Sequence, residues 1–268
     1  MTWDPQQYAR FADDRSRPFH DLLARVGATA PREVVDVGCG TGALTALLAR
    51  RWPQARVRGF DSSAEMVAQA PADAGVEFSV ADARGFDATG VDVLVSNAVL
   101  QWVPEHRDLL VRWAGQLAPG GELAVQVPSN LGAPSHALMR ELADSPRWRG
   151  PLSGVLRVGD AVAEPGEYLD LLQGAGLAAD VWRTEYLHVL AGADPVLEWV
   201  RGTGLRPVLQ ALGAQAAEFE REYAALLRRA YPPREHGTVF GFRRTFLVAR
   251  VPTRVGTPVE AGVSSGRA

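Results

Sequence analysis

Residues 33–42, Glu-Val-Val-Asp-Val-Gly-Cys-Gly-Thr-Gly, constrain the fold of this chain more than any other stretch. The apolar run predicts a buried β-strand over residues 33–38. Gly38, Gly40 and Gly42 predict a sharp turn that a ligand can approach closely, because glycine has no Cβ. Residues 43–52 predict a helix immediately afterwards, and the free N–H groups at a helix N-terminus favour anions. The stretch therefore predicts a nucleotide-type site.

The spacing of the glycines narrows the kind of site. Gly38, Gly40 and Ala43 fit the dinucleotide pattern G-x-G-x-x-[G/A]. Asp36 extends the pattern to D-x-G-x-G-x-G. A turn that binds pyrophosphate has little use for a carboxylate there, because like charges repel. The alternative is that Asp36 only caps the turn.

Strands and helices alternate along most of the chain. Strands are predicted over residues 33–38, 56–60, 76–80, 91–97, 122–127, 179–190 and 239–250, and helices over 43–52, 64–70, 104–117, 135–142, 165–176, 195–200 and 208–231. Ser62 and Ser63 are expected to cap the helix at 64. The alternation predicts an α/β fold, a doubly wound, mostly parallel sheet with helices on both faces.

We expect three divisions of the chain. Residues 1–30 form a helical lead-in, broken at residues 15–18, whose aromatic residues Trp3, Tyr8 and Phe11 either pack into the core or form a lid. Residues 31–251 form the main domain, with helical cap insertions at 130–165 and 192–235. Residues 252–268 lack a core pattern and are expected to be a disordered tail.

Composition excludes several classes of protein. The net charge of −3 provides no basic field for nucleic acid, and no apolar run reaches membrane-spanning length. All 28 basic residues are arginines, which suit carboxylate recognition. Cys39 is the one cysteine, so no disulfide framework is possible, and without a visible signal peptide we expect a cytoplasmic protein. The scattered His and Cys residues favour no metal site. The oligomeric state stays open, and a monomer is compatible with the sequence.

Polar residues end the second, third and fourth predicted strands. Ligands in open α/β sheets bind beyond these ends. Asp61 stands where an acid can accept from ribose hydroxyls, and Asp82 could accept from the amino group of an adenine. Asn97 ends the fourth strand. The alternatives are that Asp61 caps the next helix and that Asp82 is a turn residue.

Together, Asp36, the three glycines, Asp61 and Asp82 resemble the class I S-adenosylmethionine (SAM)-dependent methyltransferases over residues 33–127. The resemblance implies SAM as cofactor and a Rossmann-like seven-stranded sheet with an antiparallel last strand. The cofactor-binding residues that it implies are Asp36, Gly38, Gly40, Gly42, Asp61, Ser62, Met66, Asp82, Ala83 and Asn97.

Further segments are similar to the trans-aconitate 2-methyltransferase family, from Trp3 to about Arg250. They include Trp3-Asp4-Pro5, Arg15-Ser16-Arg17-Pro18, Arg51-Trp52-Pro53, Leu100-Gln101-Trp102, Trp182-Arg183-Thr184 and Thr203-Gly204-Leu205-Arg206-Pro207. The segment around Arg206 is more specific than Leu100-Gln101-Trp102. Thr41 departs from relatives that carry proline, without threatening the turn. The resemblance implies esterification of a carboxylate of trans-aconitate or a similar small polycarboxylate.

Arginine forks suit such a substrate, because they bind carboxylates with direction. The reacting carboxylate is ionised at neutral pH, so no general base is needed. We expect Trp102, Arg206 and Arg183 to act in catalysis. The expected substrate-binding residues are Arg17, Gln101, Trp102, Arg140, Arg183, His188, Arg206 and Arg243. For each arginine, the alternative is a solvated surface charge.

Three alternative functions remain open at this level. Malonyl-carrier-protein or other small-acid O-methyltransferases share a stretch like Leu100-Gln101-Trp102. An NAD-dependent oxidoreductase would share Asp61 but has little use for Asp36 and Asp82. A non-catalytic binding protein with the same fold is expected to have a damaged glycine turn, which is intact here.

Overall fold

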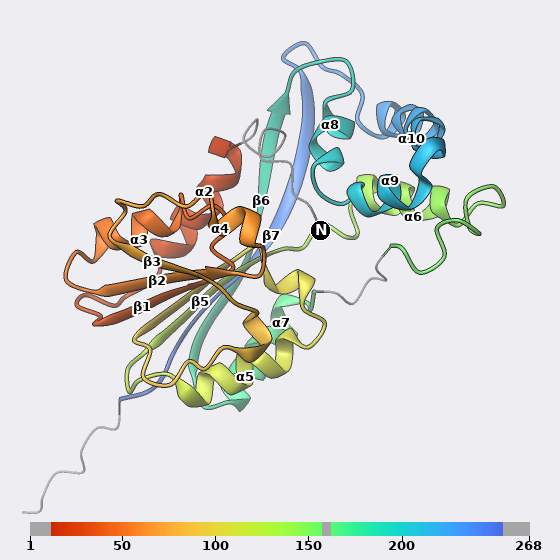
Figure 1. Ribbon diagram of the computed structural model, residues 1–268. Helices are drawn as coiled ribbons and strands as arrows, with labels where there is room; N and C mark the ends of the chain where they lie inside the picture. Colours follow the sequence, from red (N-terminus) through yellow and green to blue (C-terminus); the bar gives the residue numbers. More distant parts are fainter. Residues whose placement is uncertain (1–11, 157–161, 254–268) are drawn as a thin grey trace, which may run out of the picture.

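A seven-stranded sheet forms the centre of the protein in the computed structural model, which describes residues 12–156 and 162–253. The strands are β1 (Glu33–Val37), β2 (Arg56–Asp61), β3 (Val76–Val80), β4 (Val93–Asn97), β5 (Glu122–Pro128), β6 (Ala178–Leu190) and β7 (Thr238–Arg250). Their order is β3-β2-β1-β4-β5-β7-β6 (Figure 1). β7 runs antiparallel to both β5 and β6, and the pairs among β1 to β5 are parallel. The predicted sheet and its antiparallel last strand are confirmed.

Helices cover both faces of this sheet (Figure 1). α2 (Ala12–Leu23) and α3 (Thr45–Arg51) lie on one face, and α5 (His106–Gln116) and α7 (Pro165–Gly174) lie on the other. The inner strands β1 and β5 are buried on both faces, as their nearly continuous apolar sequences require. Large side chains such as Phe19 on α2 and Trp113 on α5 are fully buried. Each contributes about 1.5–3 kcal/mol to folding.

A separate helical layer lies beyond the carboxyl ends of the parallel strands. It consists of α6 (Pro134–Ala143), α8 (Pro195–Arg201), α9 (Arg206–Leu212) and α10 (Ala216–Ala230), and we call it the cap. The upper halves of β6 and β7 extend from the sheet into the cap (Figure 1). Its core contains Trp148, Trp199, Phe219, Tyr223 and Phe240, all fully buried. The cap helices and the ends of β6 and β7 thus share one hydrophobic core.

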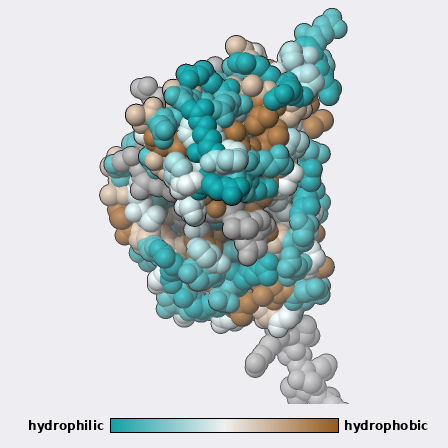
Figure 2. Space-filling view, turned by 90° about the vertical axis from the view of Figure 1, so that its right-hand side faces the viewer, coloured by the Kyte–Doolittle hydropathy of each residue, from teal (hydrophilic) through white to brown (hydrophobic). Residues whose placement is uncertain are grey.

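The outer side of the cap is polar. α10 buries Phe219, Tyr223 and Leu227, which stand four residues apart on one face of the helix, and exposes the arginines of its last turn. Figure 2 shows this side of the molecule, where hydrophilic residues cover much of the surface and apolar patches lie between them. None of the helices in the described part of the chain is both long and apolar enough to span a membrane.

Three predicted helices differ from the structure by more than two residues at an end or by a changed break. α2 continues through Pro18 where a break at residues 15–18 was expected. Burial of Phe19, Leu22 and Leu23 against the sheet offsets the lost backbone hydrogen bond. The helix predicted over 208–231 is divided into α9 and α10 at Gly213, whose φ of 52° no helix interior adopts. α4 (Ala64–Val67) is shorter than expected.

Some predictions concern residues that the structure does not describe. Trp3, Tyr8 and Phe11, the aromatic residues of the expected lid, lie in residues 1–11. Most of the expected tail, residues 254–268, also lies outside the described ranges. The lid and the tail therefore stay predictions.

Candidate active site

The glycine turn joins β1 to α3, and its three glycines have different surroundings. A Cβ on Gly38 would stand 2.2 Å from Val99, and one on Gly42 would stand 2.5 Å from Phe78, so both glycines allow close packing. Gly40 has a φ of 56° and no heavy atom within 4 Å of a Cβ built there. The open space of the turn therefore lies at Gly40, which leaves its backbone accessible to a ligand.

Asp61, at the end of β2, holds this turn. One carboxylate oxygen accepts from the N–H of Gly40 at 3.0 Å, and the other accepts from the N–H of Ser63 at 2.9 Å. Each carboxylate oxygen has a second lone pair that can accept another hydrogen bond. The cap of α4 is Ser63, so Asp61 does not cap that helix; its bonds to the turn leave room for the expected acceptor role.

Asp36 is buried beneath the turn, with 3% of its surface exposed. Burial raises the pKa of Asp36 to about 6, although a hydrogen bond from the Thr45 hydroxyl lowers it, and the carboxylate of Asp61 adds to the rise. The hydroxyl donates to Oδ2 of Asp36 at 2.6 Å. Two carboxyl groups close to one turn make the site favourable for a cationic ligand.

Cys39, in the same turn, is unsuited to nucleophilic chemistry. Burial, helped by the nearby carboxylates of Asp36 and Asp61, raises the pKa of its thiol to about 12. The reactive thiolate is therefore almost absent at neutral pH. Cys39 is a small residue packed into the turn.

The remaining cofactor candidates lie at the ends of β2 and β3. Asp82 precedes a short 3-10 helix, η1 (Ala83–Gly85), and accepts from the guanidinium of Arg84 at 2.6 Å. This contact, together with a backbone hydrogen bond from Arg84, lowers the pKa of Asp82 to about 2. Ser63, rather than Ser62, caps α4, with its Oγ accepting from the N–H of Met66. Ser62 is exposed, and Met66 and Ala83 are buried.

Asn97, at the end of β4, offers a hydrogen-bond acceptor to a polar ligand. Its Oδ1 is buried and accepts no hydrogen bond from the described residues. Ala98 follows with a φ of 58°, and the Gln101 side chain donates to its carbonyl oxygen at 2.6 Å. Trp102 ends the 3-10 helix η2 (Leu100–Trp102) and is half-buried. A buried acceptor and an open Gly40 are features that a cofactor with a cationic, hydrogen-bonding end would use.

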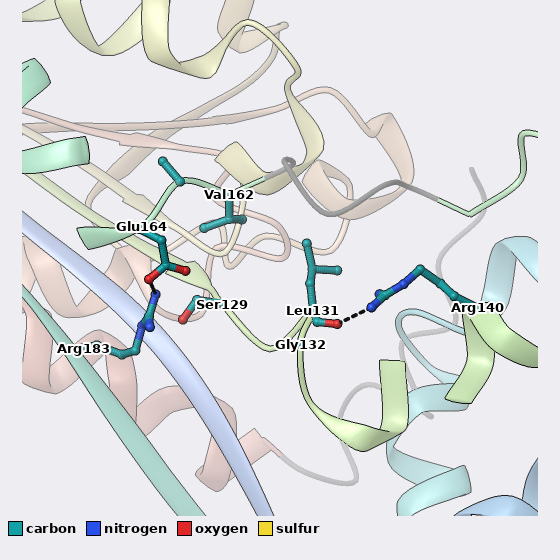
Figure 3. Close-up of a pocket in the computed structure, with 8 residues that line it drawn as sticks. Ser129, Leu131, Gly132, Arg140, Val162, Glu164 and Arg183 are labelled. Carbon is teal, nitrogen blue, oxygen red and sulfur yellow. Dashed lines mark hydrogen bonds and ion pairs between the residues drawn. The ribbon is translucent and has the colours of Figure 1, made fainter. Parts of the chain in front are cut away.

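A cavity of about 260 Å³ lies between the sheet and the cap. It is lined by Ser129, Leu131, Gly132, Arg140, Val162, Ala163, Glu164 and Arg183. Arg140 and Arg183 approach it from opposite sides, from α6 and β6 (Figure 3). Arg140 donates to the carbonyl oxygen of Leu131 at 2.8 Å, and Arg183 donates to Glu164 at 2.8 Å. The cavity follows the end of β5, where ligands bind in sheets of this kind.

Of the eight predicted substrate-binding residues, two line this cavity, Arg140 and Arg183. Arg17 lies over the ring of Tyr186 at 5.1 Å, and Arg243 pairs with Glu185 at 3.6 Å. His188 is buried and packs on Trp199 with ring centres 4.6 Å apart.

Arg206 opens α9 instead of lying in the loop where the sequence placed it, because Pro207 suits the first turn of a helix. The loop before it is pressed against α6, since a Cβ on Gly204 would stand 3.4 Å from His136. α6 also carries Arg140, so the Arg206 segment lies next to the helix that lines the cavity.

Three polar residues near the site escaped the sequence analysis. Ser129 follows β5, and its Oγ is buried without a hydrogen-bond partner among the described residues. Searching the end of the fifth strand as well as the first four would have found it. Glu164 lay in a segment without a motif. Arg244 is 5% exposed, whereas the predicted Arg243 is exposed. The alternation with Phe242 and Phe246 was the available signal for Arg244.

Over residues 12–156 and 162–253, no three His, Cys, Asp or Glu side chains gather in an arrangement that could hold a metal ion.

Comparisons with known proteins agree with this geometry. Residues 34–121 match the family described as methyltransferase domain. The trans-aconitate 2-methyltransferase of Streptomyces avermitilis is 56% identical over 259 residues, which cover 92% of this chain and 96% of that protein. The Rhodococcus jostii protein of the same name is 51% identical, over 93% of this chain and 99% of that one.

Among solved structures, the YcgJ protein of Bacillus subtilis matches with a TM-score of 0.58 and 15% identity, over 87% of this chain and 99% of that one. This likeness concerns the fold alone. The high identity along nearly the whole length of the curated relatives decides the family. The chain belongs to the trans-aconitate 2-methyltransferase family of methyltransferases.

Proposed function

We propose that this protein transfers a methyl group from SAM to a carboxylate of trans-aconitate or a closely similar small polycarboxylate, and forms a methyl ester. The observation that carries the proposal is the pair of arginines, Arg140 and Arg183, lining one cavity beyond the end of β5. The names of the relatives support the same substrate. The cavity of about 260 Å³ suits a small acid.

The cofactor would be held at the glycine turn. Asp61 would accept from the ribose hydroxyls while keeping its bonds to the backbone of Gly40 and Ser63. Oδ1 of Asn97, buried and ready to accept, would receive a hydrogen bond from the methionine end. Asp36 supplies negative charge beneath the turn. Bound there, SAM supplies an electrophilic methyl group on a cationic sulfur.

The substrate would be held through the carboxylates that do not react. Arg140 and Arg183 each offer several N–H donors in a planar fork, and Ser129 offers its hydroxyl. Because the reacting carboxylate is already ionised, no side chain has to remove a proton. The contribution of the protein is therefore orientation of the nucleophile and exclusion of water.

The alternative functions fit these features less well. Asp36 in a buried position would repel the pyrophosphate of a dinucleotide, which disfavours an NAD-dependent oxidoreductase. A malonyl group offers one non-reacting carbonyl group and no second carboxylate, so it would leave one of the two cavity arginines without a ligand. The intact turn around Gly40 disfavours a non-catalytic role.

A transfer assay tests the proposal. The purified protein is incubated with methyl-labelled SAM and a panel of mono-, di- and tricarboxylates, and the product is treated with mild base. We expect label in a base-labile product, with trans-aconitate among the best acceptors. Label in no carboxylate of the panel, from a folded protein that binds SAM, would refute the proposal.

A further inference from the structure

The candidate substrate cavity already contains a carboxylate of the protein itself. Glu164, which precedes α7, accepts a hydrogen bond from Nη2 of Arg183 at 2.8 Å. Figure 3 shows this pair at one end of the cavity and Arg140 at the other. A substrate carboxylate that is to be bound by the fork of Arg183 must therefore share or replace the place of Glu164.

The two arginines differ in the partner that the structure gives them. Arg140 donates to a neutral group, the carbonyl oxygen of Leu131. Arg183 donates to a charged one. At Arg140, a substrate carboxylate would compete with a neutral carbonyl oxygen. At Arg183, it would compete with the carboxylate of Glu164.

The surroundings of Glu164 permit its side chain to leave. The side chain is 72% exposed, whereas that of Arg183 is 29% exposed. Ion pairs this close to solvent are weak, so leaving Arg183 costs little. The side chain also gives up the bond that it accepts from the backbone N–H of Glu167 in the capping box of α7, a contact that water can replace at this exposed position. The backbone would stay in place, because the N–H of Glu164 donates to Oε2 of Glu167 at 2.8 Å and Pro165 begins α7.

We propose that Glu164 is a displaceable internal carboxylate that occupies Arg183 until a carboxylate of the substrate replaces it, so that Arg183 serves substrates with two non-reacting carboxylates. This inference rests on the proposed function. A tricarboxylate brings one reacting group and two groups for the arginines, and it must displace Glu164. A dicarboxylate has one group to place, and it binds at Arg140 without disturbing the pair.

The consequence is a specificity effect that can be measured. In Glu164→Gln the carboxylate that competes for Arg183 is absent. We expect the KM for trans-aconitate to fall by about two- to fivefold, the range that weak exposed ion pairs allow. The KM for a dicarboxylate acceptor should stay unchanged, and so should the affinity for SAM.

The kinetic test uses the full-length protein with four variants: Glu164→Gln, Glu77→Gln, Arg183→Ala, and the double variant of Arg183→Ala with Glu164→Gln. Glu77→Gln is the matched control, because Glu77 forms a comparably exposed pair with Arg56 on β2, away from the cavity. It should leave every KM unchanged. Arg183→Ala is combined with Glu164→Gln, and the effect of Glu164→Gln should vanish in that background. Calorimetric titration of trans-aconitate into the complex of the protein with S-adenosylhomocysteine measures the affinity without turnover. The ratio of the Kd of the variant to that of the wild type should match the ratio of their KM values.

Two results would overturn the inference. The first is an unchanged or raised KM for trans-aconitate in Glu164→Gln, which would make Glu164 a positioning residue or a bystander. The second is a fall in KM that persists without Arg183. Both are read as ratios to an active wild type, so they leave the proposed function standing. A wild type that methylates no polycarboxylate would instead refute the proposed function itself.

Discussion

Replacing the buried Asp36 by asparagine should stabilise this protein above pH 6. The folded state raises the pKa of Asp36 from 3.8 to about 6, because burial disfavours the charged carboxylate. The folded protein therefore binds this proton more tightly than the unfolded chain does. It follows that the contribution of Asp36 lowers stability progressively as the pH rises from about 4 to about 6, and the full cost is present above that window.

The magnitude follows from the two pKa values. The difference between about 6 and 3.8, at about 1.36 kcal/mol for each pKa unit, corresponds to a cost of about 3 kcal/mol at pH 8 and about 1.6 kcal/mol at pH 5. Asparagine has nearly the same shape, and its side-chain oxygen can still accept from the Thr45 hydroxyl. The stability of Asp36→Asn relative to the wild type should therefore increase by about 1.4 kcal/mol between pH 5 and pH 8.

Urea denaturation at a series of pH values measures this difference directly. Both proteins are unfolded in the absence of ligand at intervals from pH 5 to pH 8, and the free energies of unfolding are subtracted. Asp73→Asn, at an exposed position, is the control for the change of net charge. A difference between Asp36→Asn and the wild type that does not vary with pH would refute the reasoning, because it would mean that burial does not perturb Asp36.

Three further variants test the site. Asp61→Ala should weaken SAM binding by about 1.5–3 kcal/mol in calorimetry and also lower the Tm, since the carboxylate holds the backbone of the turn; unchanged affinity in a folded variant would exclude Asp61 from the site. Arg206→Lys should raise the KM for trans-aconitate and leave SAM affinity unchanged, with kcat falling too if Arg206 sets the attack angle; wild-type kinetics here and in Arg206→Ala would remove it from the site. Cys39→Ala should keep kcat within about twofold, because the raised pKa leaves almost no thiolate; a loss of tenfold or more in a folded variant would contradict this.

Local pattern was enough to predict the strand, turn and helix that carry the cofactor candidates. The glycines of the turn, Asp36 and Asp61 stand at fixed separations from strands whose apolar runs mark them as buried. A parallel sheet brings the ends of such strands to one edge whatever the details of packing. The contacts of Asp61 with the backbone of Gly40 and Ser63 agree with this expectation.

Alternation along a strand also indicates which side chains are buried, once the buried face of the strand is known. Along β7, Arg243 and Arg244 must point to opposite faces, and the flanking aromatic residues Phe242 and Phe246 indicate that Arg244 faces inward. The sequence analysis selected Arg243, which the structure leaves exposed and paired with Glu185. Residue type alone favoured either arginine equally, and burial separated them.

The substrate half of the site was decided by tertiary structure. The pairing of Arg183 with Glu164 and the approach of Arg140 from the other side depend on how α6, α7 and β6 pack around the end of β5. No local propensity encodes these contacts, because they join segments through the cap, whose core forms only when its helices meet. The sequence by itself determined the fold class and the cofactor turn, through short-range periodicity and backbone geometry. Which arginines share a cavity, and which carboxylate pairs with one of them, was decided only when long-range packing brought those segments together.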